Sequence, residues 1–153
     1  MEARQSIQDI NQIFGMVFLL AQRWQMMGDR ELKATGITTK QWMVLVSIQN
    51  LFEAPPSVSE LANAMGSSRQ NVKQLALNLE KKGFLEIIPD AKDLRIQRFV
   101  LTKKNEAFWA ARQEQDQAFI KTLFQDLDAK QIAGTREAIE QMVTTTDVLI
   151  VMP

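Results

Sequence analysis

The sequence of 153 residues contains no cysteine and no histidine. The absence of cysteine excludes disulfides, thiolate nucleophiles and thiol redox sensors, and the absence of histidine excludes imidazole acid–base catalysis and a Ser-His-Asp triad. Zinc sites of the Cys/His type are excluded as well. The carboxylates are scattered, and there is no glycine-rich phosphate loop. We therefore expect neither a metal nor another cofactor, and no enzyme activity.

The sequence also lacks a long hydrophobic run. Its longest, residues 13–21, has nine residues and is too short to cross a bilayer. It follows twelve mostly polar residues and has no small-residue cleavage site, so it does not resemble a signal peptide. With 46% hydrophobic and 24% charged residues, the composition is typical of a globular protein. We expect a cytoplasmic protein with no membrane partner.

The formal net charge is zero, but the charges are unevenly distributed along the chain. Residues 65–104 contain nine Lys or Arg and four Asp or Glu, a balance of +5, and the remainder carries −5. A local basic segment is the electrostatic footprint that nucleic-acid binding needs. The alternative is an uneven but otherwise ordinary charged surface.

Apolar residues at spacings of three and four predict a long helix over residues 6 to about 33. The apolar face is wider than one stripe, so we expect burial on more than one side, against a partner subunit as well as a core. The apolar positions are Ile7, Ile10, Ile13, Phe14, Met16, Val17, Leu20, Ala21, Trp24 and Met27.

Two shorter helices are predicted next, each opened by a capping box. Thr38 and Gln41 begin the first, which the prolines of residues 53–56 end. Ser57 and Glu60 begin the second.

A further helix, about 67–82, follows directly after Gly66, which we expect to be a left-handed cap. Ser67 is predicted as its N-cap, with Gln70 three residues later, and Gly83 ends it. The first turn of this helix is entirely polar, which is unusual unless that end contacts something polar.

After Gly83 the pattern predicts strands. Residues 84–88 and 95–101 favour β-structure, and the polar loop between them favours turns, so we expect a hairpin with a protruding charged tip. From Thr102 helices return, over 104 to about 125 and again after a cap at Asp128. Because few residues join these helices, we expect an antiparallel pair, and we expect the chain ends to interlock with a second copy.

The order of helix, short helix, glycine turn, helix and hairpin indicates a winged helix-turn-helix, whose second helix enters the major groove. The polar first turn then has a reason, because arginine pairs with guanine, and glutamine or asparagine with adenine. The alternative is a surface helix whose polar side chains are only solvated. The candidate DNA-binding residues of this helix are Ser67, Ser68, Arg69, Gln70, Asn71, Lys73 and Gln74.

The hairpin tip, residues 89–95, adds Lys92 and Arg95 to these candidates, with Arg98 nearby. An arginine on a protruding loop can enter the minor groove. We expect Asp93 to hold Arg95 or a backbone donor in place while Arg95 reaches outward. A solvated loop is the alternative, which Asp90 and Asp93 partly favour.

These residues resemble the MarR-type winged-helix transcriptional regulators over nearly the whole chain. The most specific part is the wing motif Asp-x-Arg-x-x-x-Leu-x-Leu-Thr, present as Asp93, Arg95, Phe99, Leu101 and Thr102. Phe99 stands where leucine is usual in this motif.

Two longer stretches carry the same resemblance. Residues 57–86 look like the helix-turn-helix of the family, and residues 35–45 are similar to the segment that leads into its second helix. Asn105, where the family often has glycine, is a mild departure, because asparagine tolerates a left-handed conformation.

The resemblance implies a mainly α fold with a small β-hairpin wing. A winged helix-turn-helix in 37–104 would lie between a dimerisation helix in 1–36 and dimerisation helices in 105–153. It also implies a homodimer on a pseudo-palindromic operator in double-stranded DNA, with recognition helices in successive major grooves and wings in flanking minor grooves. Repression of nearby promoters, relieved by a small aromatic ligand, is implied too.

The candidate effector pocket is formed by Met16, Leu20 and Trp24 together with Trp42, which would line a soft aromatic cavity. The alternative is that this stripe is plain core. For the protein as a whole, the main alternative is a winged-helix protein-interaction module without DNA binding. Such a module is expected to carry acidic or apolar residues where this chain has polar and basic ones.

Overall fold

The computed structural model describes the backbone of residues 2–151 and the side chains of residues 6–150. Contacts divide the chain into two compact units, Met1–Ala110 and Ala111–Pro153. The functional division at residues 36 and 104 stays a prediction, and its outer ends, residues 1 and 152–153, lie outside the described part.

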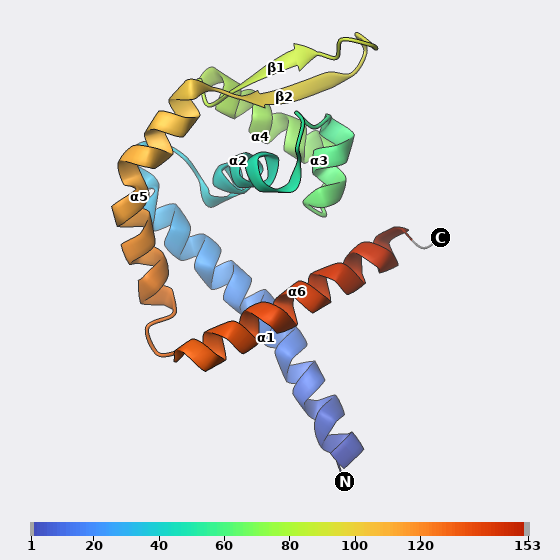
Figure 1. The fold of residues 1–153 in the computed structure, drawn as a ribbon, viewed down its shortest axis with the longest axis vertical. Coiled ribbons are helices and arrows are strands. Elements are labelled where there is room, and N and C mark those ends of the chain that lie inside the picture. The colour runs from blue at the N-terminus through green and yellow to red at the C-terminus, as the bar shows by residue number, and fades with distance from the viewer. Residues whose placement is uncertain (1, 152–153) are drawn as a thin grey trace. The chain divides into compact units, whose positions relative to one another are not determined.

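The elements follow the predicted order, and the mainly helical fold with one antiparallel hairpin is confirmed (Figure 1). They are α1 (Glu2–Glu31), a short 3-10 helix (Lys33–Thr35), α2 (Thr39–Leu51), α3 (Val58–Ala64), α4 (Arg69–Lys81), β1 (Leu85–Pro89), β2 (Gln97–Leu101), α5 (Lys103–Leu123) and α6 (Ala129–Val151).

Reciprocal capping boxes open three of the helices. In each, the N-cap side chain accepts a hydrogen bond from the backbone N–H of the residue three positions later. The side chain of that later residue accepts a hydrogen bond from the backbone N–H of the N-cap in return. The pairs are Thr38 with Gln41, Ser57 with Glu60, and Asp128 with Gln131.

The start of α2 lies directly against α1. Gly28 is buried, and a Cβ at this position would lie 2.6 Å from Oγ1 of Thr39, so the close approach requires glycine. The backbone N–H of Thr39 donates to Oδ1 of Asp29 at 2.7 Å, and its hydroxyl donates to the carbonyl of Gln25 at 3.1 Å. The C-terminal part of α1 is therefore fixed to the first turn of α2.

The hairpin is tied to the helical part through β2. Its register pairs Leu85 with Leu101 and Ile87 with Phe99, which places these four side chains on one face. Phe99 has no exposed surface, and its backbone N–H donates to the carbonyl of Pro56 at 3.0 Å. The wing is thus anchored to the segment that leads into α3.

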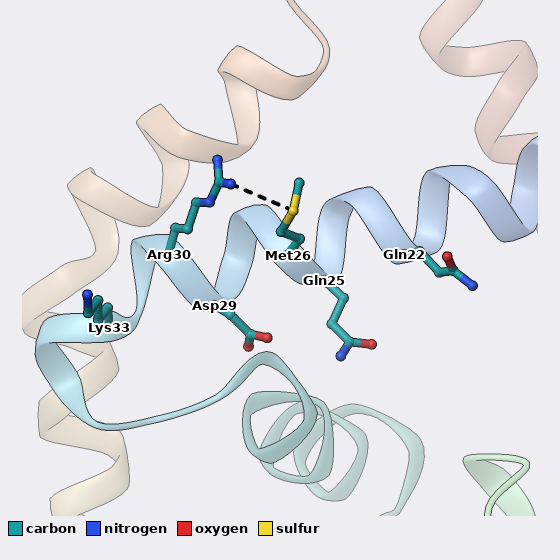
Figure 2. Close-up of a pocket in the computed structure, with 6 residues that line it drawn as sticks. All are labelled: Gln22, Gln25, Met26, Asp29, Arg30 and Lys33. Carbon is teal, nitrogen blue, oxygen red and sulfur yellow. Dashed lines mark hydrogen bonds between the residues drawn. The ribbon is translucent and has the colours of Figure 1, made fainter.

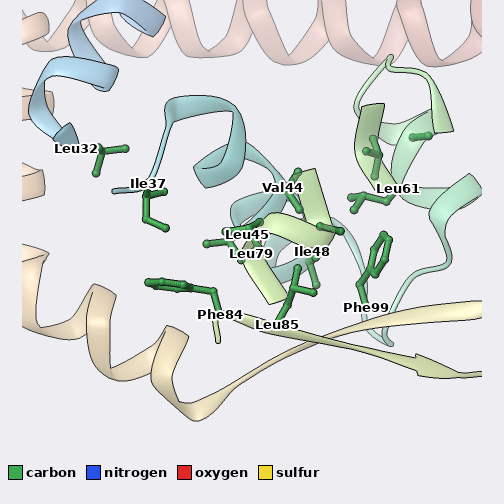
Figure 3. Close-up of a cluster of buried hydrophobic side chains, with 13 residues drawn as sticks. Leu32, Ile37, Val44, Leu45, Ile48, Leu61, Leu79, Phe84, Leu85 and Phe99 are labelled. Atoms are coloured by element: carbon green, nitrogen blue, oxygen red, sulfur yellow. The ribbon is translucent and has the colours of Figure 1, made fainter. Parts of the chain in front are cut away.

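One hydrophobic core lies between α2, α3, α4 and the hairpin (Figure 3). Phe84 at the end of α4 extends it to α5 through an edge-to-face contact with Phe108, with ring centroids 5.0 Å apart. The core residues are Leu32, Ile37, Val44, Leu45, Ile48, Leu61, Ala62, Val72, Ala76, Leu79, Phe84, Leu85 and Phe99.

α1 and α6 contribute little to this core. Along α1 every side chain from residue 6 to residue 23 is exposed in the single chain, and so is every described side chain of α6. The prediction that α5 and α6 pack as an antiparallel pair is wrong, because the apolar residues of α6 lie at the surface instead of against a neighbour. Among the described helices, none combines the length and apolar character that a bilayer span requires.

The core predicts a contrast between two leucines of α2. Leu45 is 1% exposed and Leu51 is 58% exposed. Leu45→Ala should lower the free energy of unfolding by about 2–5 kcal/mol, since it removes buried methyl groups and leaves a cavity. Leu51→Ala should change it by less than about 0.5 kcal/mol. Urea unfolding followed by circular dichroism, at one protein concentration, measures both, and equal losses would contradict the assigned core.

Candidate nucleic-acid interface

The way α3 ends determines where α4 begins. Gly66 has a left-handed φ of 58°, and its N–H donates to the carbonyl of Asn63 at 3.1 Å. The N–H of Ser67 donates to the carbonyl of Ala62 at 2.9 Å. Together these bonds form a Schellman motif, which satisfies the last carbonyls of a helix. Ser67 therefore belongs to the end of α3.

The N-cap of α4 is Ser68, whose Oγ accepts from the backbone N–H of Asn71 at 3.1 Å. The prediction of Ser67 as N-cap, with Gln70 three residues later, is wrong by one position, because the Schellman motif uses Ser67. The Ser67 hydroxyl instead accepts from Nδ2 of Asn71 at 2.9 Å. Both serines thus hold Asn71 at the front of the helix.

The opposite faces of α4 differ in character. Its inner face, Val72, Ala76 and Leu79, has no exposed surface. Four polar side chains on the outer side are exposed: Arg69, Gln70, Lys73 and Gln74. The N–H groups of the first helical residues precede the first intrahelical hydrogen bond, so they can donate to an anion such as phosphate.

The wing loop is ordered by Asp90, a residue that the sequence analysis did not select as a stabiliser. Its Oδ1 accepts from the N–H of Lys92 at 2.8 Å and of Asp93 at 3.0 Å. The N–H of Asp90 donates to the carbonyl of Ile96 at 2.8 Å. The sequence signal was the aspartate placed directly after a strand, because aspartate forms such turns with the backbone two residues on.

Asp93 and Arg95 form the contact that the sequence predicted. Oδ1 of Asp93 accepts from both the backbone N–H and Nε of Arg95 at 3.0 Å, and Oδ2 accepts from a terminal guanidinium nitrogen at 3.1 Å. This hydrogen bonding lowers the pKa of the Asp93 carboxyl. The Arg95 side chain is 90% exposed at the tip, although its guanidinium is paired with Asp93.

Arg98 lies in a different setting from the other basic candidates. Its Nε donates to Oδ2 of Asp90 at 2.8 Å, and one terminal nitrogen donates to Oε2 of Glu60 at 2.7 Å. The Arg98 side chain is 28% exposed. The guanidinium thus joins the wing loop to the first turn of α3, a link that spans residues far apart in sequence and has no local signal.

The network remains charged at ordinary pH. The hydrogen bond from Arg98, followed by those from the backbone of Lys92 and Asp93, lowers the pKa of Asp90 to about 2. The pKa of Glu60 is lowered chiefly by the hydrogen bond from the Ser57 backbone. A depressed carboxyl pKa stabilises the folded state above the unfolded pKa, and this contribution is lost only as the pH falls toward the folded value. The contribution of Asp90 to the stability of the folded state is therefore constant from about pH 5 to pH 8.

The structure brings most of the ten DNA-binding candidates to the surface of two elements, the start of α4 and the wing. Two candidates, Ser67 and Arg98, are partly buried. The other eight are exposed: Ser68, Arg69, Gln70, Asn71, Lys73, Gln74, Lys92 and Arg95.

The candidate effector residues do not enclose a cavity in the single chain. Met16 and Leu20 are 57% and 44% exposed, whereas Trp24 and Trp42 are partly buried. An open cleft of about 430 Å³ does lie along the C-terminal half of α1, but none of these four residues lines it (Figure 2). Its lining consists of Met26 and five residues with polar or charged groups, Gln22, Gln25, Asp29, Arg30 and Lys33.

Comparison with known proteins gives the same fold. A family model described as the MarR family matches residues 35–96. The MepR–DNA complex of S. aureus covers 85% of this chain and 95% of its own, with a TM-score of 0.71 and 19% identity. Other solved regulators give TM-scores of 0.75 to 0.78 at similar identity.

Two curated relatives are similar in sequence. The transcriptional activatory protein BadR of Rhodopseudomonas palustris is 32% identical over 100 residues, which is 65% of this chain and 57% of the relative. The transcriptional repressor MprA of Escherichia coli is 35% identical over 80 residues, or 52% of this chain and 46% of the relative. The chain thus matches about half the length of these relatives, which are regulators and not enzymes. The resemblance predicted from the sequence is confirmed: residues 35–96 match the MarR family model, and solved MarR-type regulators share the fold of this chain.

Proposed function

We propose that this protein is a homodimeric, sequence-specific DNA-binding transcriptional regulator. The observation that carries the proposal is the first turn of α4, where Arg69, Gln70 and Asn71 are exposed at the open end of a helix whose other face is buried. Base-edge contacts in the major groove come from this position in a helix-turn-helix. Names of the relatives support the same function, since two are transcription regulators and one neighbour was solved with DNA.

The wing supplies the second proposed contact. Lys92 and Arg95 are exposed on a loop whose backbone is fixed by Asp90 and Asp93. A rigid basic loop of this kind fits the narrow, electronegative minor groove beside the recognition helix. The sign of regulation stays a prediction, because one relative is named an activator and the other a repressor.

The exposed apolar surface of α1 supports the dimer. Residues 16–20 are all apolar and all exposed, although successive residues point to different sides of a helix. A helix that is apolar on every side is normally buried. A second copy is the commonest cover for such a surface, and it would also supply a second recognition helix for a pseudo-palindromic operator.

A small aromatic effector stays a prediction. Met16 and Leu20 are exposed in one chain, so they would enclose a cavity only when the proposed second copy covers α1. The cytoplasmic location also stays a prediction.

The primary experiment is selection of bound sequences from a random duplex library with the full chain, followed by mobility-shift titration of the selected duplex. We expect enrichment of an inverted repeat whose half-sites lie about one helical turn apart, the spacing that a two-fold symmetric dimer imposes. No enrichment over the input library would contradict the proposed function and favour the protein-interaction module.

Arg69→Ala should weaken binding to the selected duplex by about 10- to 100-fold and relax the preference at one base position, because a bidentate guanine contact is lost. Titration against single-base variants of the duplex measures both effects. Lys130→Ala, which removes a positive charge at the start of α6, is the control. Unchanged affinity and ranking of duplexes in Arg69→Ala would show that Arg69 reads no base.

Arg95→Ala should weaken binding to all duplexes alike. It should also make the negative slope of the logarithm of the binding constant against the logarithm of salt concentration shallower by about one, since one fewer phosphate is neutralised. The matched control is Leu94→Ala in the same loop, where an exposed uncharged side chain should leave the slope unchanged. A slope that is the same in Arg95→Ala and wild type would exclude Arg95 from the phosphate contacts.

Phe18→Glu should raise the dimer dissociation constant by about 30-fold or more, because it places a charge in the centre of an apolar interface. Gln12→Glu introduces the same charge at another exposed position of α1 and is the control. Sedimentation velocity over a concentration series measures the dissociation constants, with circular dichroism to verify helix content. A wild-type chain that is monomeric at micromolar concentration would rule out the dimer.

A further inference from the structure

Arg98 joins the wing to the helix-turn-helix through side-chain hydrogen bonds. It projects from β2 and donates to Asp90 in the wing loop at 2.8 Å and to Glu60 in α3 at 2.7 Å. A third, longer contact of 3.4 Å reaches the carbonyl of Pro55. These acceptors surround the guanidinium from three separate segments of the chain.

The backbone reinforces the same junction. Arg98 forms an isolated antiparallel bridge with Ser57, and the next residue, Phe99, donates its N–H to the carbonyl of Pro56 at 3.0 Å. The segment that opens α3 is therefore paired with β2 at a single bridge. Because Glu60 also accepts from the N–H of Ser57 at 2.7 Å, the Arg98 contact is coupled to the N-terminal cap of α3.

The contact to Asp90 extends the effect to the tip of the wing. One oxygen of Asp90 binds Arg98, and the other accepts the N–H groups of Lys92 and Asp93. The orientation of this carboxylate therefore fixes the loop that carries Lys92. A guanidinium matches two acceptors in a rigid fork, which a lysine ammonium does not reproduce.

A direct DNA contact by Arg98 would carry a cost. Nε and one terminal nitrogen of Arg98 already donate to Asp90 and Glu60, so a phosphate bound by this guanidinium would lie beside two carboxylates. Charged groups of like sign at an interface oppose association.

We propose that Arg98 is a positioning residue and not a DNA contact: it braces the wing against α3, so that Lys92 and Arg95 stand at a fixed place relative to the start of α4. The inference rests on the proposed DNA-binding function. It differs from the sequence-based expectation, in which Arg98 belonged with the basic residues that touch DNA.

The test is Arg98→Lys, which keeps the charge and removes the fork. In the free protein, exchange of the Lys92 and Asp93 amides measured by NMR should accelerate about tenfold, as their acceptor loses its orientation. Affinity for the selected duplex should fall about tenfold with an unchanged salt slope. The control is Arg136→Lys in the exposed ion pair with Glu140 on α6, which should alter neither quantity.

The opposite result identifies a phosphate contact. If Arg98→Lys keeps wild-type affinity and wild-type amide exchange, while Arg98→Gln lowers the salt slope by about one, Arg98 touches DNA and the inference is overturned. Unchanged exchange and affinity in both variants overturn it as well. If the amides exchange faster but the wild-type chain enriches no duplex, the brace is supported and the proposed DNA-binding function fails.

Discussion

Burial of one face of α4 is the constraint on which the rest of the structure depends. Val72, Ala76 and Leu79 have no exposed surface and pack against α2, α3 and β1. Because the helix repeats every 3.6 residues, this fixes its rotation about its own axis, and Arg69, Gln70 and Lys73 must then lie on the outer side. Rolling the helix to redirect them would expose the core residues. The orientation of the proposed reading face is thus a consequence of packing.

Both ends of α4 are fixed by the same kind of turn. Before it, Gly66 and Ser67 close α3 in a Schellman motif, and after it Gly83 and Phe84 close α4 itself with bonds of 2.8 and 3.0 Å. Lys82 adds tertiary contacts at this end. Its ammonium donates to the carbonyl of Gly36 and to Oε1 of Gln41 in the capping box of α2. α4 is therefore held by α2, and the first turn of α2 is bound to α1.

The features that sequence reasoning predicted well are those with a local chemical cause. Capping boxes at Thr38 and Ser57 need only residues three positions apart, and Gly66 and Gly83 have the positive φ that their place after a helix predicts. The N-cap of α4 was displaced by one residue because two neighbouring serines satisfy the same local rule. Only the hydrogen bond from Ser67 to the end of α3 distinguishes them.

Features that depend on distant residues were not predictable in this way. A basic residue in a strand gives no sign that two carboxylates from other segments will surround it, so Arg98 was grouped with Arg95 although one is 28% and the other 90% exposed. The expected packing of α5 on α6 failed for a related reason. A short connection permits antiparallel packing but does not require it, and the apolar residues of α6 are exposed in the single chain.

The same contacts explain how a chain of zero net charge presents a basic surface. Of the four acids in residues 65–104, three accept internal hydrogen bonds: Glu80 from the N–H of Ile87, Asp90 from Arg98 and the wing backbone, and Asp93 from Arg95. Their negative charge is directed at donors that also lie within residues 65–104. Arg69, Lys73 and Lys92 remain exposed on the side where α4 begins and the wing projects. The electrostatic field that DNA would meet is therefore set by the pairing of the acids within residues 65–104, and the net charge of the whole chain does not describe it.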